Sequence, residues 1–214
     1  MATYLEIVNK VMRRLRENDV TSVQETHYSR LIGELVNVVK AEVEDAWNWS
    51  ALRSTITAYT SDTIYSYALT GFGVRSRVLD VVNDTNNNMM EYQTTEWFDK
   101  MFLGGSLETG IPHYWNLNGV DSNGDSQVDI YPVPNGLYAI RFNIVKPQGE
   151  LTLDTDVIQV PYQIVVEGAL ARAISERGAD GGYQEQEARY KQILGDYIAI
   201  DAGNRPDETI WYSV

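Results

Sequence analysis

The hydrophobic pattern of this 214-residue chain changes its period twice. In the first 53 residues, apolar side chains recur every three or four positions, which is the spacing of amphipathic helices. Between residues 54 and 150, short β-branched and aromatic runs are separated by Asn, Gly, Asp and Pro, which indicates strands joined by turns. Helical spacing returns after residue 150. This order predicts an α+β protein in which the two ends of the chain pack together.

Two capping-box signatures mark predicted helix starts near the N-terminus. Thr3 pairs with Glu6, and Ser22 pairs with Glu25, each ahead of an apolar stripe. Two further helical stripes follow residue 160, and Gly178 is placed to end the first of them. Because neither pair of helices covers its own apolar face, we expect the N- and C-terminal pairs to form one four-helix bundle.

The middle of the chain predicts an antiparallel β domain inserted into this bundle. Ser61 and Asp62 lie between two strand-like runs and predict a hairpin. Pro132 and Pro134 predict a corner, since proline cannot continue a central strand. The predicted boundaries are 1–53 for the first helix pair, 54–150 for the β-rich domain, 151–201 for the second helix pair and 202–214 for an extended tail.

Composition and missing motifs argue against enzymatic chemistry. The chain has no cysteine and two histidines, which excludes disulfides, thiolate sites and histidine-rich metal sites. It contains no Gly-x-Ser-x-Gly elbow, Walker A loop or HExxH motif. A hydrolase acting through Asp154 and Asp156 is the remaining alternative, but these carboxylates lie in a polar connector. We therefore expect neither catalysis nor a cofactor.

The distribution of charge predicts a soluble protein that does not grip nucleic acid. The net charge is −13, and the acidic excess lies after residue 53. Tight binding of a phosphate backbone needs Lys and Arg to replace condensed counterions. The chain also has no apolar run long enough to span a membrane and no secretion signal, so we expect synthesis in a cytoplasm.

A calcium site is the main alternative to a purely structural role. Asp121, Asn123, Asp125 and Asp129 place oxygen donors at every second or fourth position, as in the first half of a calcium loop. However, Ser126 stands where such a loop needs glycine, and proline stands where it needs a bidentate glutamate. A β-hairpin tip explains the same residues. The favoured prediction is therefore no metal, with a calcium-dependent β-sandwich-type binding module as the alternative function.

Two features predict protein–protein contacts. Arg13, Arg14 and Arg16 form a basic cluster that is either a solvated face or a partner for acidic neighbours in an assembly. The chain ends in Ile-Trp-Tyr-Ser-Val, whose aromatic side chains suit either insertion into a groove of another protein or packing back on the bundle.

The order of several segments resembles the head-to-tail adaptors of tailed bacteriophages, the group that includes tail tubular protein A. These segments are TYLEIVNKVMRRLRE, DAWNWSAL, IPHYWNLNG, VDIYPVPNGLYAIRFNIVKP and VIQVPYQIVVEGALARAISERG, followed by a tyrosine-rich last helix.

The resemblance implies a non-enzymatic virion protein of the neck or tail, made in the cytoplasm of a bacterial host. It implies a homo-oligomeric ring, typically dodecameric, that contacts the portal protein and a tail nozzle or tail tube protein. DNA would pass through its lumen without specific binding, and no membrane would be involved. Ile210, Trp211 and Tyr212 are the residues implied to bind the portal.

Overall fold

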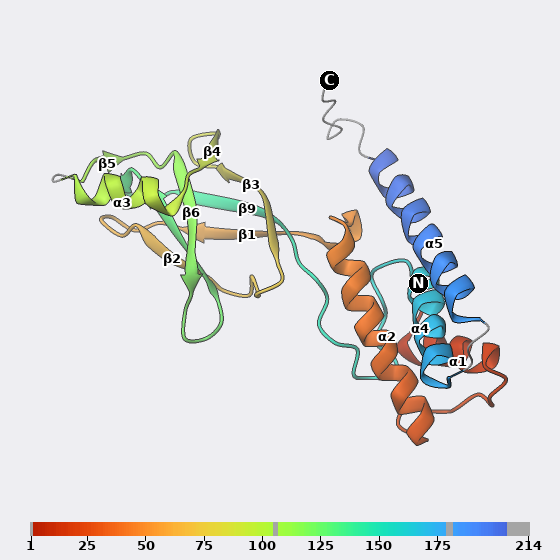
Figure 1. Ribbon diagram of the computed structural model, residues 1–214. Helices are drawn as coiled ribbons and strands as arrows, with labels where there is room; N and C mark the ends of the chain where they lie inside the picture. Colours follow the sequence, from red (N-terminus) through yellow and green to blue (C-terminus); the bar gives the residue numbers. More distant parts are fainter. Residues whose placement is uncertain (1, 105–106, 179–181, 205–214) are drawn as a thin grey trace, which may run out of the picture. The chain divides into compact units, whose positions relative to one another are not determined.

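The structure is a computed structural model that describes residues 2–104, 107–178 and 182–204. The chain divides into two compact units (Figure 1). Residues Met1–Leu52 and Pro147–Val214 belong to the helical unit, and Arg53–Lys146 form the β unit.

The helical unit contains four of the five α-helices of the described chain. No helix among the described residues is long and apolar enough to cross a membrane. The helices of this unit are α1 (Tyr4–Arg14), α2 (His27–Ala46), α4 (Tyr162–Glu176) and α5 (Tyr183–Gly203), with a short 3-10 helix at Ser50–Leu52 after α2.

One predicted helix start is confirmed and the other is wrong. At α1 the Thr3 hydroxyl accepts from the Glu6 amide, and the Glu6 carboxylate accepts from the Thr3 amide. The second helix begins after Thr26, whose hydroxyl accepts from the Ser29 amide. The Glu25 carboxylate accepts instead from the amide of Thr21. The helix is therefore capped at Thr26, four residues after the predicted cap Ser22, by a capping box that Thr26 forms with Ser29.

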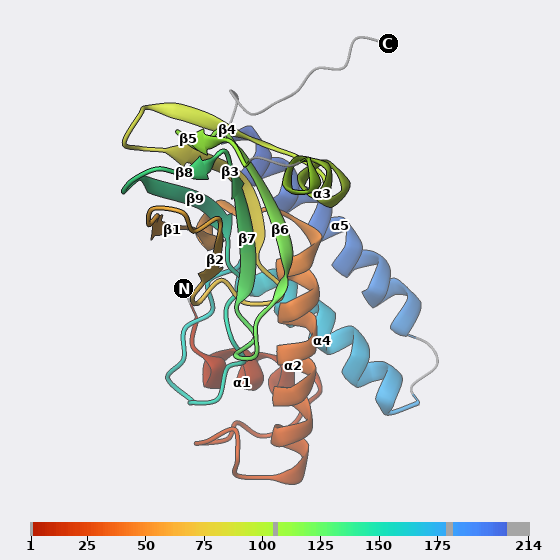
Figure 2. The same ribbon diagram turned by 90° about the vertical axis from the view of Figure 1, so that its left-hand side faces the viewer.

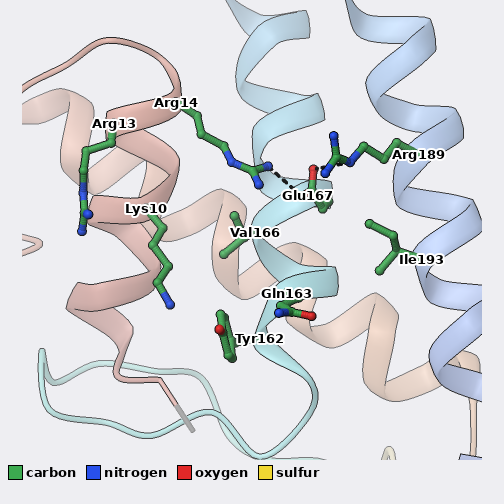
Figure 3. A pocket seen from close by; sticks show the side chains of 9 residues that line it. All are labelled: Lys10, Arg13, Arg14, Tyr162, Gln163, Val166, Glu167, Arg189 and Ile193. Atoms are coloured by element: carbon green, nitrogen blue, oxygen red, sulfur yellow. Dashed lines mark ion pairs between the residues drawn. The ribbon is translucent and has the colours of Figure 1, made fainter. Parts of the chain in front are cut away.

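The predicted four-helix bundle is wrong. Helix α4 is buried without a break from Ile164 to Ala171, and α1, α2 and α5 all pack against it. Figure 3 shows α4 lying between α1 and α5, which therefore do not close around a shared core. The described contacts of α5 with other helices are made mainly with α4. The physical reason is that the buried side chains of α4 do not form one stripe but run through consecutive positions, so neighbouring helices pack on several sides of it.

Two glycines allow the helices to approach closely. A Cβ atom on Gly168 of α4 would lie 2.6 Å from Val39 Cγ1 and 2.9 Å from Tyr190 Cε2. A Cβ atom on Gly33 of α2 would lie 2.4 Å from the Tyr4 hydroxyl. All three distances are shorter than a Cβ atom tolerates, so glycine sets the spacing of α2 against α1 and of α4 against α2 and α5.

The β unit is built on one seven-stranded sheet with the order β1-β9-β3-β4-β6-β7-β2 (Figures 1 and 2). Helix α3 (Thr95–Leu103) lies between β4 and β6 in the chain. A second, two-stranded sheet joins β5 and β8. The strands are β1 (Arg53–Tyr59), β2 (Ser66–Leu69), β3 (Arg77–Asn83), β4 (Asn88–Tyr92), β5 (Thr109–Gly110), β6 (Tyr114–Val120), β7 (Ser126–Tyr131), β8 (Val133–Pro134) and β9 (Ala139–Val145).

The sheet is mixed, so the prediction of an antiparallel domain is also wrong. Strands β4 and β6 run parallel, with Glu91 opposite Tyr114 and Tyr92 opposite Trp115. A parallel pair cannot be joined by a tight turn and needs a crossover connection. The segment that contains α3 supplies that crossover, and α3 packs against β6.

The hairpin predicted around Ser61 and Asp62 is absent from the described sheet. Strand β1 pairs with β9, and β2 pairs with β7, so the two strands lie at opposite ends of the strand order. These end strands also contact each other, and the sheet nearly closes into a barrel. By contrast, the polar run Asn-Asp-Thr-Asn-Asn-Asn at residues 83–88, whose composition is typical of a turn, does join an antiparallel pair, β3 and β4.

The core of the β unit lies inside this curved sheet. Strand β9 contributes three of its most buried side chains because it is paired on both edges, by β1 and β3. The buried apolar cluster consists of Leu69, Phe72, Val81, Met90, Trp115, Val128, Ile130, Ile140, Phe142 and Ile144.

Candidate functional site

A cationic pocket in the helical unit is the strongest candidate site. It has a volume of about 520 Å³ and lies among α1, α4 and α5. Figure 3 shows side chains from all three helices converging on it. We call it the cationic pocket, and its lining residues are Lys10, Arg13, Arg14, Tyr162, Gln163, Val166, Glu167, Arg189 and Ile193.

The polar contacts of this pocket centre on the Glu167 carboxylate. Its side chain is only 5% exposed, although it is ionisable and sits on the most apolar helix of the chain. Arg14 of α1 approaches its carboxylate to 2.7 Å, and Arg189 of α5 approaches to 3.5 Å (Figure 3). Gln186 of α5 also donates to it. A buried carboxylate is tolerated when it is paired and hydrogen-bonded, and here the pairs connect three helices.

The remaining cations stand at the rim. Lys10 places its Nζ 3.9 Å from the centroid of the Tyr162 ring, a cation–π contact. Arg13 pairs with Asp19 at 3.0 Å, and both side chains are more than half exposed. At the floor of the pocket, the Glu167 carboxylate compensates the charge of Arg14 and Arg189. At its rim, Lys10 and Arg13 add further positive charge.

The basic cluster singled out in the sequence is divided by the structure. Arg13 and Arg14 line the cationic pocket, whereas Arg16 follows the end of α1 and is not among the lining residues. Sequence reasoning missed Glu167 and Arg189. The available signal was that Glu167 is the one charged residue in the run from Ile164 to Ala171.

Three of the four candidate calcium ligands, Asp121, Asn123 and Asp125, lie in the tip of the β6–β7 hairpin, and Asp129 lies within β7. Oxygen atoms of the three aspartates accept hydrogen bonds from the protein, whereas Asp129 Oδ1 is buried without a partner in the part of the chain that the structure describes. The Asp121 Oδ1 atom accepts from the backbone amides of Asn123 and Asp125. Asp125 Oδ1 accepts from the amide of Gly71, and the buried Asp129 accepts from the side chain of Asn118. Among the described residues, no group of three or more His, Asp or Glu side chains is placed to hold a metal ion.

Asp154 and Asp156 organise the connector before α4. Asp154 Oδ1 accepts from the amide of Val23 at 3.0 Å, and Asp156 Oδ2 accepts from the amides of Thr152 and Leu153. The backbone carbonyls of both aspartates also receive the first amides of α1. The hydrogen bonds from Leu153 and Thr152 lower the pKa of Asp156. These contacts fit a structural role in the loop.

The same region perturbs a buried tyrosine. Burial, together with the carboxylates of Glu34, Asp154 and Glu150, raises the pKa of Tyr4 to about 12. The ring of Tyr4 lies against Gly33, so the phenol belongs to the packed contact between α1 and α2.

The predicted portal-binding residues Ile210, Trp211 and Tyr212 lie outside the described residues. The described chain ends at Asn204, beside a second cavity of about 290 Å³ with a mainly apolar lining. At this end of α5, Asp201 accepts from the Trp47 indole at 2.9 Å. This hydrogen bond links the C-terminal part of α5 to the residue that caps α2.

Comparison with known proteins gives one family. The profile of the family described as SU10 adaptor protein matches residues 2–209. No curated protein matches the chain.

Proposed function

We propose, from the premise that the chain belongs to the SU10 adaptor protein family, that it joins the head of a bacteriophage to its tail. The observation that carries this proposal is the extent of the family match, which covers residues 2–209 and so nearly all of both units. A phage adaptor is a structural part of the particle, and the proposed role needs no catalytic group. The proposed partners are the portal protein on one side and a tail nozzle or tail tube protein on the other.

In the proposed assembly, identical copies form a closed ring of about twelve subunits. Heterologous contacts, in which one surface of a copy meets a different surface of the next, generate such a ring when the rotation closes. DNA would pass through the lumen. The net charge of −13 per copy supports passage without capture, because an acidic wall repels phosphate groups.

Portal binding is assigned in this proposal to Ile210, Trp211 and Tyr212. Large aromatic and aliphatic side chains at the end of a chain are suited to fill a groove in a partner. Helix α5 ends at Gly203 with Asn204 as its cap, so removal of residues 205–214 leaves the helix complete.

The test is a pull-down of purified chain on the portal protein of the same phage. Deletion of residues 205–214, and the triple change of Ile210, Trp211 and Tyr212 to alanine, should both abolish binding. A matched control in the same segment, Asp207→Ala with Glu208→Ala, should retain it. Retention of binding by the deletion variant, with unchanged helical circular dichroism, would refute the assignment of the tail.

The adaptor role itself has a separate test. A phage that lacks this protein should produce filled or emptied heads without attached tails, as seen by electron microscopy. Tailed particles of normal appearance in its absence would contradict the proposed function.

A further inference from the structure

We propose that the cationic pocket binds an acidic segment of a second copy of this chain. The inference rests on the proposed function, because it assigns to this pocket one of the contacts between neighbouring copies in the ring. The pocket supplies the positive surface, and carboxylates of the neighbouring copy supply the negative one.

The pocket carries more positive charge than its own carboxylates balance. Lys10, Arg13, Arg14 and Arg189 line it. Among the described residues, the carboxylates paired with these cations are Glu167 and Asp19. The four cations therefore exceed their two carboxylate partners by two charges, on a chain whose net charge is −13.

Arg13 at the rim and Arg189 beside Glu167 both keep hydrogen-bond donors for an incoming anion. Arg189 approaches Glu167 through Nε, and Arg13 approaches Asp19 through Nε. Each guanidinium has five N–H groups in a planar fork that matches a carboxylate. The side chains of Arg13 and Arg189 are 60% and 59% exposed, so their remaining donors are accessible. Within the described chain, the Lys10 ammonium has an aromatic contact but no carboxylate partner.

The arrangement favours carboxylates of a protein over nucleic acid. The cations surround one depression of about 520 Å³, which has room for a few side chains but not for a duplex. Nucleic-acid binding instead needs many phosphate contacts along a surface, and the overall charge opposes it. Tyr162, Val166 and Ile193 add an apolar wall against which the stems of Asp or Glu side chains can pack.

A second copy is the acidic partner whose charge is known from the sequence. Each copy contains thirty Asp and Glu residues and seventeen Lys and Arg residues. Copies with this excess repel one another unless opposite charges meet where they touch. An exposed cationic depression on an acidic protein provides that contact.

The test uses Lys10 as a chemical reporter. A mixture of unlabelled and ¹⁵N-labelled full-length chain is treated with a carbodiimide, which joins an ammonium to a carboxylate that it touches. Mass spectrometry of the peptides should show Lys10 joined to Asp or Glu of the other isotope. The yield should fall at about 1 M salt, where the Debye length is about 3 Å.

Matched variants separate the pocket from overall charge. Arg13→Gln with Arg189→Gln should lower the mixed-isotope yield at Lys10 about tenfold, which corresponds to roughly 1.4 kcal/mol of association free energy. Arg16→Gln with Lys100→Gln removes the same charge from exposed positions outside the pocket and should leave the yield unchanged. Arg13→Gln alone, which removes a contact only with exposed Asp19, serves as the pocket variant if the double change disturbs folding.

Several results would overturn the inference. Lys10 peptides of a single isotope only, or equal losses in both double variants, would show that the pocket does not hold a neighbouring copy. Mixed-isotope links at other lysines without Lys10 would leave the proposed ring standing and reject this contact. Links at Lys10 from a protein that fails to join heads to tails would reject the proposed function and keep the contact between copies.

Discussion

At the residue scale, the most informative side chains are charged groups inside the helical unit. Lys40 and Glu44 are 2% and 0% exposed, and Lys40 Nζ lies 3.0 Å from Glu44 Oε1. The same ammonium donates to the carbonyls of Gln148 and Gly149, both at 2.9 Å. The pair therefore fastens α2 to the segment that enters the helical unit after the sheet. Lysine and glutamate four positions apart ordinarily indicate an exposed helix face, so the sequence did not reveal this burial.

Replacing Lys40 with methionine should destabilise the helical unit strongly. The change removes the Lys40 ammonium from a carboxylate that is 0% exposed, and breaking a buried ion pair in this way costs about 3–5 kcal/mol in other proteins. Urea unfolding followed by helical circular dichroism measures the difference. The double variant Lys40→Met with Glu44→Leu should recover part of the lost free energy of unfolding, because the buried carboxylate is removed together with the lysine. Equal stabilities of wild type and the single variant would contradict the role given to this pair.

At the element scale, the connector before α4 is held by its own aspartates. Asp156 closes a turn on Thr152 and Leu153, and the loop caps the start of α1 through backbone carbonyls. This explains why a polar connector rich in Asp occurs between two well-packed segments. The connector provides acceptors for amides that the first turn of a helix cannot satisfy.

This geometry gives the helical unit a dependence on acid pH. Because the pKa of Asp156 is lowered in the folded state, its contribution to stability is complete above the ordinary value of 3.8. The contribution is lost as the pH falls through the lowered pKa of the folded protein. The variant Asp156→Asn should be less stable than wild type near neutral pH. The difference between their free energies of unfolding should become smaller at about pH 3. Urea titrations at several pH values measure it, and a gap that does not change with pH would exclude this cause.

At the scale of the whole molecule, the chain crosses between its two units at neighbouring points. Arg53 at the start of β1 is the register partner of Val145 at the end of β9. Partners in an antiparallel pair have Cα atoms about 5 Å apart, so the two crossings lie side by side. Each unit also has its own buried core. A domain with a separate core can in principle fold alone.

Two shortened chains test this independence. Residues 53–146 alone should give a cooperative thermal transition and a strand-type circular dichroism spectrum. Joining Leu52 to Pro147 through a short Gly-Ser linker should give a helical protein that also melts cooperatively. Cooperative melting of the full chain combined with two unfolded fragments would show instead that neither unit is stable without the other.

The sequence by itself determined the local features of this protein. The capping box at Thr3, the turn at residues 83–88 and the end of α4 near Gly178 depend on residues within a few positions of one another. The order of segments also carried the resemblance to phage adaptors, because family membership is recorded along the chain.

Only the tertiary structure decided which distant segments meet. Strands β1 and β2 looked like one hairpin, but each pairs with a strand more than fifty residues away. Helix α4 lies at the centre of the helical unit, and Glu167 on this helix pairs with one arginine from α1 and one from α5. A turn signal favours a reversal of the chain but does not choose a partner strand. The partner is chosen by the total apolar area buried, which depends on every segment at once.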